Sequence, residues 1–394
     1  MKNTVQHYAW GSATAIPELL GEENPSHKPW AELWMGAHPK APSLVNFEGQ
    51  WVALDKLIEI HPQDILGQKV AARFQNKLPY LFKVLAAAKP LSVQAHPERE
   101  QAHRGFEAEN SRGLPADALN RNYKDENHKP ECICALTGFW ALHGFRNIDD
   151  IVTMLTICCP TGLAAELDQL RPRPNAQSLK QFYSQLMQMD SERQKRIIDE
   201  TLHNMHRLPE TDAVFWMKRL SEEYPSDIGI LSPILLNLIC LQPGQALFLP
   251  AGELHAYLEG TGIELMANSD NVLRGGLTPK NIDVAELLKV VRFEPRTINT
   301  LKCVYESANE KVYVSPADEF VLSWINVSDG SSYQSSASRS VEILLCTTGE
   351  AYIQEAGTHK ILKMKKGQSV LVPAKANRYR ISGTAAVYKA AVPV

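Results

Sequence analysis

The sequence has no excess of charge of either sign and no long hydrophobic run. It contains 41 Lys and Arg against 44 Asp and Glu, a net charge of -3 over 394 residues. No chain-wide field is therefore available to hold a nucleic-acid duplex or an anionic bilayer. The longest apolar stretch, Ile228 to Leu241, is interrupted by Gly229, Ser232, Pro233 and Asn237, and it is shorter than the roughly 20 residues that a membrane helix needs. We expect neither a nucleic-acid partner nor a membrane association.

The sequence also lacks paired cysteines, a secretion signal and the common nucleotide-binding and hydrolase motifs. Seven cysteines, an odd number without C-x-x-C spacing, exclude a disulfide framework and make a thiolate zinc site improbable. The N-terminus has no apolar signal-peptide core, and we expect a cytoplasmic protein. No P-loop, G-x-S-x-G or H-E-x-x-H motif is present. Any metal must therefore be held by imidazole and oxygen ligands.

The hydrophobic pattern predicts a mainly β protein with an inserted helical module. Short β-rich runs separated by turn residues fill the first hundred residues and return after Asp227. Between them, Leu179 to Met187 has the apolar spacing of one helix face, and a capping-box pattern predicts that the next helix begins at Ser191. After the insertion we expect separate strands at Ala256 to Leu258 and Ile263 to Ala267, joined by a Gly-Thr-Gly turn.

One turn motif resembles the cupins, which are small double-sheet jelly rolls. Gly244, Pro250, Gly252 and His255 form G-x5-P-x-G-x2-H. A similar G-x5-P run ends at Pro373 near the C-terminus, but Arg378 occupies the histidine position. We therefore expect two jelly-roll domains, of which the second is degenerate. The expected boundaries are a catalytic cupin domain at 1–148 with 227–292, a helical insert at 149–226 and a degenerate cupin domain at 293–394.

Four scattered side chains form a candidate metal site. In the strand predicted at 91–95, alternation places Ser92, Gln94 and the following His96 on one face. Glu131 follows a polar insertion, and His255 ends the cupin-like turn. Gln94, His96, Glu131 and His255 together offer two imidazoles, one amide oxygen and one carboxylate, a set that suits Zn²⁺ with room for water or substrate. A plain ion pair and a solvated edge strand are the structural alternatives.

Ordered sequence blocks resemble those of the type I mannose-6-phosphate isomerases, which are zinc-dependent phosphomannose isomerases. The blocks are Tyr8-Ala-Trp-Gly11, Ala31-Glu-Leu-Trp-Met-Gly-Ala-His-Pro39, Leu91-Ser-Val-Gln-Ala-His-Pro97, Asn122-Tyr-Lys-Asp-Glu-Asn-His-Lys-Pro-Glu131, His255-Ala-Tyr257 and Glu264 to Lys280. Together they span nearly the whole chain, whereas any single block would be a weak motif. The resemblance implies a catalytic jelly roll, a helical insert and a C-terminal jelly roll. It also implies one zinc ion on Gln94, His96, Glu131 and His255, and Arg274 as an active-site residue.

The implied reaction interconverts mannose 6-phosphate and fructose 6-phosphate through an enediol, by moving a proton between C2 and C1. We hypothesise that Glu264 is the carbon base, because a hairpin would aim it into the same cavity as His255. Asp270 and Lys129 are the alternatives and are also expected to contact substrate. Arg274 and Lys280 offer positive charge for a phosphate, with Ser92 as a further donor, and Arg274 could instead stabilise the enediolate.

Two other functions remain open on sequence grounds. A cupin dioxygenase with non-haem iron would need a two-His-one-carboxylate triad with open positions, and a fourth ligand at Gln94 argues against it. A non-catalytic sugar-binding cupin would bind phosphosugar without proton exchange. We expect a monomeric enzyme whose partner is a small phosphosugar.

Overall fold

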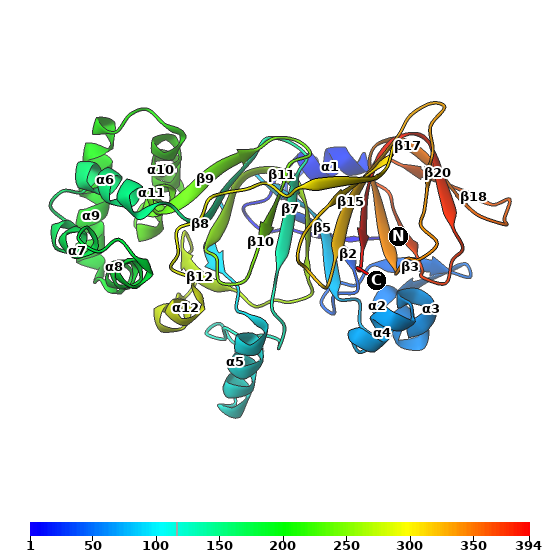
Figure 1. Cartoon of the computed structure of the whole chain (residues 1–394), viewed down its shortest axis with the longest axis horizontal. Helices are drawn as coiled ribbons and strands as arrows, with labels where there is room; N and C mark the ends of the chain where they lie inside the picture. Colours follow the sequence, from blue (N-terminus) through cyan, green and yellow to red (C-terminus); the bar gives the residue numbers. More distant parts are fainter. Residues whose placement is uncertain (116) are drawn as a thin grey trace.

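The computed structural model describes residues 1–115 and 117–394, and it has three parts arranged along its longest axis (Figure 1). A β-rich part lies in the middle, a helical part lies at one end and a second β-rich part lies at the other. The elements of the middle part are β1 (Thr4–Gln6), α1 (Ala15–Leu20), β2 (Glu32–Gly36), β3 (Leu44–Phe47), β4 (Gln50–Ala53), α2 (Leu54–Ile60), α3 (Pro62–Leu66), α4 (Gln68–Arg73), β5 (Tyr80–Ala87), β6 (Val93–Ala95), α5 (Arg99–Ser111), β7 (Glu131–Ala135), β8 (Phe139–Phe145), β9 (Leu236–Leu241), β10 (Ala246–Leu249), β11 (His255–Ala267), β12 (Leu273–Gly276) and α12 (Val284–Val290).

The strand β11 joins the two layers of the middle part. Its C-terminal half pairs with β5 and β7, which extend to β2, β1 and β10. Its N-terminal half pairs with β6 and β8, which extend to β12 and β9. All of these pairings are antiparallel, as expected for a jelly roll. The same strand therefore contributes side chains to both layers.

The single long strand β11 corrects the predicted hairpin. Residues 259–262 continue the strand instead of turning, and the register against β8 shifts between Tyr257 and Glu259. Such a bulge changes which face the following side chains occupy. Gly260 has a φ of +126° and lies against Phe139, a conformation that glycine adopts without steric cost. Gly-Thr-Gly therefore permits an irregular, closely packed strand segment here, a role that composition alone does not distinguish from a turn.

The helical part lies between β8 and β9 and packs on the middle part through a continuous apolar core. Its elements are α6 (Ile148–Cys158), α7 (Ala164–Leu170), α8 (Ala176–Gln188), α9 (Ser191–Asn204), η1 (Met205–Arg207), α10 (Asp212–Glu223), η2 (Ile228–Leu231) and α11 (Ser232–Leu235). The predicted apolar face of α8 is buried. The start of α9 is as predicted, but Asp190 caps it by accepting a hydrogen bond from the Arg193 amide. The predicted Ser191 cap is therefore wrong by one residue.

The C-terminal part is a second antiparallel β domain. Its strands are β13 (Cys303–Ser307), β14 (Glu310–Tyr313), β15 (Val321–Val327), β16 (Tyr333–Gln334), β17 (Glu342–Glu355), β18 (Ile361–Lys365), β19 (Ser369–Val372) and β20 (Tyr379–Ala391). One apolar core contains residues of both β domains, including Phe82 and Ile343. The Tyr80 hydroxyl also donates to the Ala390 carbonyl oxygen across this boundary. Within the described residues, none of the helices is long and apolar enough to cross a bilayer.

Candidate metal centre and active site

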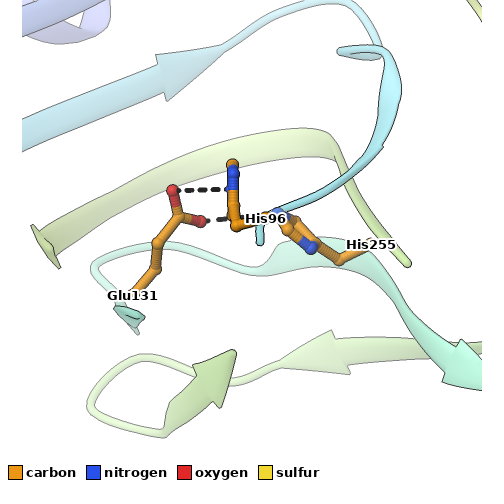
Figure 2. Close-up of side chains that lie close together, drawn as sticks. All are labelled: His96, Glu131 and His255. Carbon is orange, nitrogen blue, oxygen red and sulfur yellow. Dashed lines mark ion pairs between the residues drawn. The ribbon is translucent and has the colours of Figure 1, made fainter. Parts of the chain in front are cut away.

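Three potential metal ligands meet inside the middle β domain (Figure 2). His96 directly follows β6, Glu131 begins β7 and His255 begins β11. One donor atom from each side chain lies within 4.8 Å of the other two, and each residue is only 1 % exposed. The chain thus brings together three strand ends from distant parts of the sequence.

Both imidazoles are oriented by a backbone carbonyl oxygen at the same ring nitrogen. His96 Nδ1 lies 2.7 Å from the Asn271 carbonyl oxygen and His255 Nδ1 lies 2.9 Å from that of Glu253. A carbonyl oxygen only accepts, so each Nδ1 donates and each neutral ring keeps Nε2 as its lone-pair donor. Burial and the nearby Lys129 ammonium lower the pKa of His96 to about 4. The ring is therefore neutral at pH 7, which is the form that binds a metal.

The spacing of these donors fits Zn²⁺. His96 Nε2 lies 3.2 Å from Glu131 Oε1, and His255 Nε2 lies 3.4 Å from Glu131 Oε2. Tetrahedral bonds of about 2.0–2.1 Å imply separations of about 3.3 Å between ligand atoms. His96 Nε2 is also buried without a hydrogen-bond partner among the described residues, an arrangement that a metal would satisfy. The residues present therefore fit the ion.

Gln94 lies beside this cluster, directly opposite His255 in the strand pairing. Its Nε2 atom is 3.4 Å from His255 Nε2. Amide nitrogen and oxygen exchange places when the terminal group rotates by half a turn. Ligation by the Gln94 oxygen requires that orientation of the amide.

Glu131 is kept ionised by its neighbours. Burial opposes its ionisation, but Lys129, His96 and His255 outweigh burial and hold the pKa of Glu131 well below its usual range. Lys129 Nζ lies 2.9 Å from Glu131 Oε1. A carboxylate in this state is ready to bind a cation.

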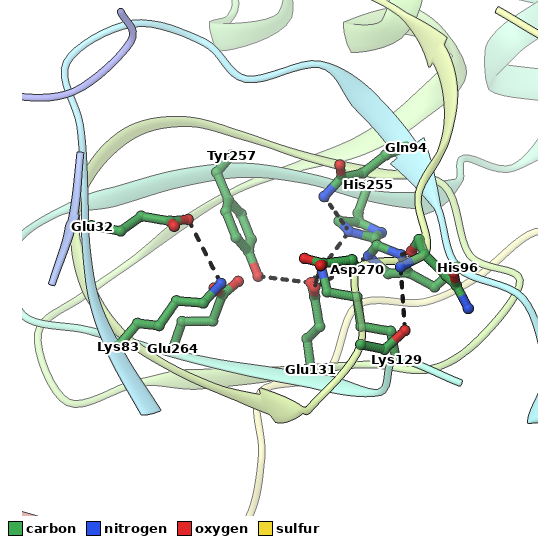
Figure 3. Close-up of polar contacts among 12 residues, drawn as sticks. Glu32, Lys83, Gln94, His96, Lys129, Glu131, His255, Tyr257, Glu264 and Asp270 are labelled. Atoms are coloured by element: carbon green, nitrogen blue, oxygen red, sulfur yellow. Dashed lines mark hydrogen bonds and ion pairs between the residues drawn. The ribbon is translucent and has the colours of Figure 1, made fainter. Parts of the chain in front are cut away.

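Glu264 belongs to a second buried ionic group next to the metal cluster (Figure 3). Lys83 Nζ donates to Glu264 Oε2 at 2.7 Å and lies 3.6 Å from Glu32 Oε1. Burial raises the pKa of Glu264, and the nearby Glu131 and Glu32 carboxylates add to that shift against the opposing effect of Lys83. Tyr257 lies between this group and the histidines, with its hydroxyl 3.5 Å from Glu131 Oε2.

Asp270 is held by two basic side chains at the edge of the cluster. Lys40 Nζ lies 2.7 Å from Asp270 Oδ2, and His38 Nε2 lies 3.6 Å from the same oxygen. Burial alone would raise the pKa of Asp270, but His38 and Lys40 lower it well below its ordinary value. Asp270 is thus an ionised carboxylate at neutral pH.

The predicted phosphate-binding residues lie on the β6–β12 side of the site. Arg274 is opposite Gln94 in the strand pairing, and Lys280 follows β12. Burial together with the positive charges of Arg274 and Lys124 lowers the pKa of Lys280, so these cations are close enough to interact. Ser92 is half-buried and directly precedes β6. Lys124 is a cation near this side that the sequence analysis did not single out.

Lys83 and His38 were not predicted from the sequence. Every residue of β5 is buried, and Lys83 is the charged residue within this strand. A lysine in such an apolar strand requires a buried anionic partner, and this requirement could have linked it to Glu264. His38 belongs to the sequence block Ala31 to Pro39, but nothing in that block indicates that Asp270 is its partner.

Comparisons with known proteins agree with this geometry. Residues 1–148 match the phosphomannose isomerase type I catalytic domain, residues 162–236 its helical insertion domain and residues 309–391 the mannose-6-phosphate isomerase cupin domain. The mannose-6-phosphate isomerase of Escherichia coli K12 is 43% identical over 389 residues, which cover 97% of this chain and 96% of that protein. The chain belongs to the type I phosphomannose isomerase family.

Solved structures of the family have the same fold. A crystal structure of a mutant phosphomannose isomerase from Salmonella typhimurium has a TM-score of 0.93 and 40% sequence identity, covering 100% of this chain and 98% of that one. A crystal structure described as mannose 6-phosphate isomerase with zinc bound has a TM-score of 0.93 and 41% identity, with the same coverage. The predicted class, mainly β with cupin domains and a helical insertion, is confirmed. The matches do not favour a dioxygenase or a non-catalytic module.

Proposed function

We propose that this protein is a mannose-6-phosphate isomerase that uses one Zn²⁺ per chain to interconvert mannose 6-phosphate and fructose 6-phosphate. The observation that carries the proposal is the buried convergence of His96, Glu131 and His255 in a chain that matches mannose-6-phosphate isomerases over 97% of its length. A zinc-bound relative of the same fold supports the choice of metal.

Gln94, His96, Glu131 and His255 would hold the ion. When bound, zinc supplies positive charge that stabilises the negative charge developing on the sugar oxygens during enolisation. Because Glu131 is the single anion among these four ligands, about one net positive charge would remain. The neutral state of His96 and the carboxylate state of Glu131 follow from their surroundings in the protein.

Glu264 is our candidate for the base that moves the proton between C2 and C1. Its burial raises its proton affinity, which a base acting near neutral pH requires. Lys83 fixes the orientation of its carboxylate through the bond to Oε2. Asp270 and Lys129 remain the alternatives: the pKa of Asp270 is strongly lowered, and the Lys129 ammonium is engaged by Glu131. Both are less suited to accept a proton from carbon, and we assign them to substrate contacts.

Arg274 and Lys280 are proposed to bind the phosphate, with Ser92 as an additional donor. Their shared side of the site and their mutual electrostatic effect support this role. A guanidinium fork and an ammonium together match a dianionic phosphate.

Proton exchange with solvent tests the proposed reaction. Incubation of mannose 6-phosphate with the zinc-loaded protein in heavy water should yield fructose 6-phosphate containing deuterium at C1, because the base that holds the abstracted proton exchanges it with solvent before it returns a proton to C1. Saturable binding without product would support the sugar-binding alternative. Oxygen consumption would support the dioxygenase.

We further propose the domain division at 148/149, 226/227 and 292/293, and a monomeric cytoplasmic enzyme without a nucleic-acid partner. Helical structure continues past the second boundary, through α11 to Leu235. The seven free cysteines are typical of a reducing compartment. The molar mass of the purified protein, measured by light scattering, tests whether it is a monomer.

A further inference from the structure

One carboxylate of the C-terminal domain contacts two segments of the middle domain that adjoin metal-site residues in sequence. Glu319 lies between β14 and β15 and is 4 % exposed. The Arg99 guanidinium donates to its Oε1 atom, and His128 Nε2 lies 2.8 Å from the same oxygen. We call Arg99, His128 and Glu319 the Glu319 cluster. Two segments of the middle domain thus meet at a single oxygen atom.

Both partners of Glu319 are close in sequence to metal-site residues. Arg99 is the first residue of α5 and follows His96 by three positions. His128 precedes Glu131 by three positions and adjoins Lys129, whose ammonium contacts Glu131. Residues 117–130 before β7 contain neither helix nor strand, so long-range contacts must fix the end of this loop.

The contacts of Glu319 keep a buried carboxylate ionised. Burial disfavours its ionisation, but His128 and Arg99 outweigh burial and lower the pKa of Glu319. Its Oε2 atom is buried and lacks a hydrogen-bond partner among the residues that the structure describes. Such an atom costs stability. Arg99 and His128 therefore hold an ionised carboxylate at the boundary between the two domains.

We propose that Glu319 is a positioning residue through which the C-terminal domain holds the segments that carry His96, Lys129 and Glu131. This role rests on the proposed zinc-dependent function. It gives the degenerate domain, which has Arg378 where a cupin histidine is expected, a part in maintaining the metal site of the other domain. Loss of the contact should loosen both segments and speed the release of zinc.

The neighbouring residue Asp318 provides a matched control. Asp318 Oδ2 lies 2.7 Å from Arg73 Nη2 at the end of α4. This ion pair also joins the C-terminal domain to the middle domain, but Arg73 is distant in sequence from all three clustered metal donors. Asp318→Asn therefore removes an interdomain ion pair to α4 while leaving the contacts of Glu319 with Arg99 and His128 in place.

Zinc release from the full-length protein tests the proposal. Glu319→Ala should release zinc to a chelator about tenfold faster than the wild type, and hydrogen exchange should increase in a peptide covering residues 122–131. Its kcat should fall more than its KM rises, because Lys129 and Glu131 move. Glu319→Gln should recover part of the loss, because an amide oxygen can still accept from Arg99. Asp318→Asn should release zinc within about twofold of the wild-type rate.

Wild-type zinc release and exchange in Glu319→Ala would overturn the proposal, as would equally fast release from Asp318→Asn. If Glu319→Ala does not fold, unchanged zinc release in Glu319→Gln would overturn it as well. If the wild type binds zinc but does not isomerise mannose 6-phosphate, the proposed function fails, while faster zinc release from Glu319→Ala would still support the positioning role.

Discussion

Gln94 would be a neutral ligand of the zinc ion, and this lack of charge is predicted to be important for turnover. Gln94→Glu would add a second anionic ligand beside Glu131 and cancel the net positive charge of the proposed zinc site. We expect this variant to retain zinc while turnover falls about tenfold to a hundredfold. Metal content and kcat should be measured on the same preparation. A variant that keeps both zinc and full turnover would show that the residual charge is unimportant.

The neutral state of His96 predicts how the metal-free protein responds to acid. The pKa of His96 is about 4 in the folded protein and about 6.5 in an unfolded chain. Between these values the unfolded chain binds the extra proton, so stability is fully present above pH 6.5 and falls as the pH drops to about 4. The loss is about 3 kcal/mol at most. Urea unfolding of the metal-free wild type and His96→Gln at pH 7 and pH 5 should show a smaller pH effect in the variant. Equal pH effects would contradict the lowered pKa.

The buried Lys83 is predicted to be important for folding. Lys83→Met leaves the Glu32 and Glu264 carboxylates buried without their cation, and it should lower the free energy of unfolding by about 3–5 kcal/mol. Combining it with Glu264→Gln removes one of the unpaired charges and should recover part of the loss. Chemical denaturation checks both variants. An additive double variant would show that the two side chains do not interact.

At the scale of single elements, β11 carries the geometry of the site. Its bulge lets His255 and Glu264 both point inward although their positions differ by nine, an odd number that would place them on opposite faces of a regular strand. A Cβ atom at Gly260 would lie 2.6 Å from the Gly138 carbonyl oxygen and 2.8 Å from Phe139 Cα. The close packing of this irregular part of β11 therefore requires a residue without a side chain at position 260.

Substitution of Gly260 tests the role of this closely packed strand segment. Gly260→Ala should destabilise the protein by about 3 kcal/mol, through its positive φ and the backbone clash. Gly244→Ala is the control, because Gly244 also has a positive φ of +83° but an added Cβ would meet no atom within 4 Å. It should cost about 1 kcal/mol. Thermal or urea unfolding compares them, and equal losses would mean that the close packing at Gly260 contributes nothing.

Sequence patterns predicted elements well where one face is regularly buried. The buried face of α8 follows directly from apolar spacing. The hairpin prediction for β11 was wrong because Gly-Thr-Gly is compatible with both a turn and a bulge, and the choice depends on the packing of Phe139 against Gly260. Lys83 was missed for a similar reason, since its partner Glu264 lies 181 positions away.

At the scale of the whole molecule, the metal cluster is built from distant segments of the middle domain. The helical part and the C-terminal β domain lie on either side of that domain. The donors come from the ends of β6, β7 and β11, and the grouping of His96, Glu131 and His255 could be predicted because each residue belongs to a distinctive local motif. The contacts that the C-terminal domain makes through Glu319 could not be predicted from the sequence. Glu319 lies in no such motif, and its contacts with Arg99 and His128 form only in the folded chain.

Removal and return of the metal is the most direct test of the central claim, that His96, Glu131 and His255 hold an ion on which the proton transfer depends. The full-length protein should be stripped with a chelator and titrated with Zn²⁺ while the conversion of mannose 6-phosphate is followed. We predict that activity disappears in the stripped protein and returns in proportion to zinc until one equivalent per chain is bound. Full activity in the stripped protein, verified as metal-free by elemental analysis, would contradict the account.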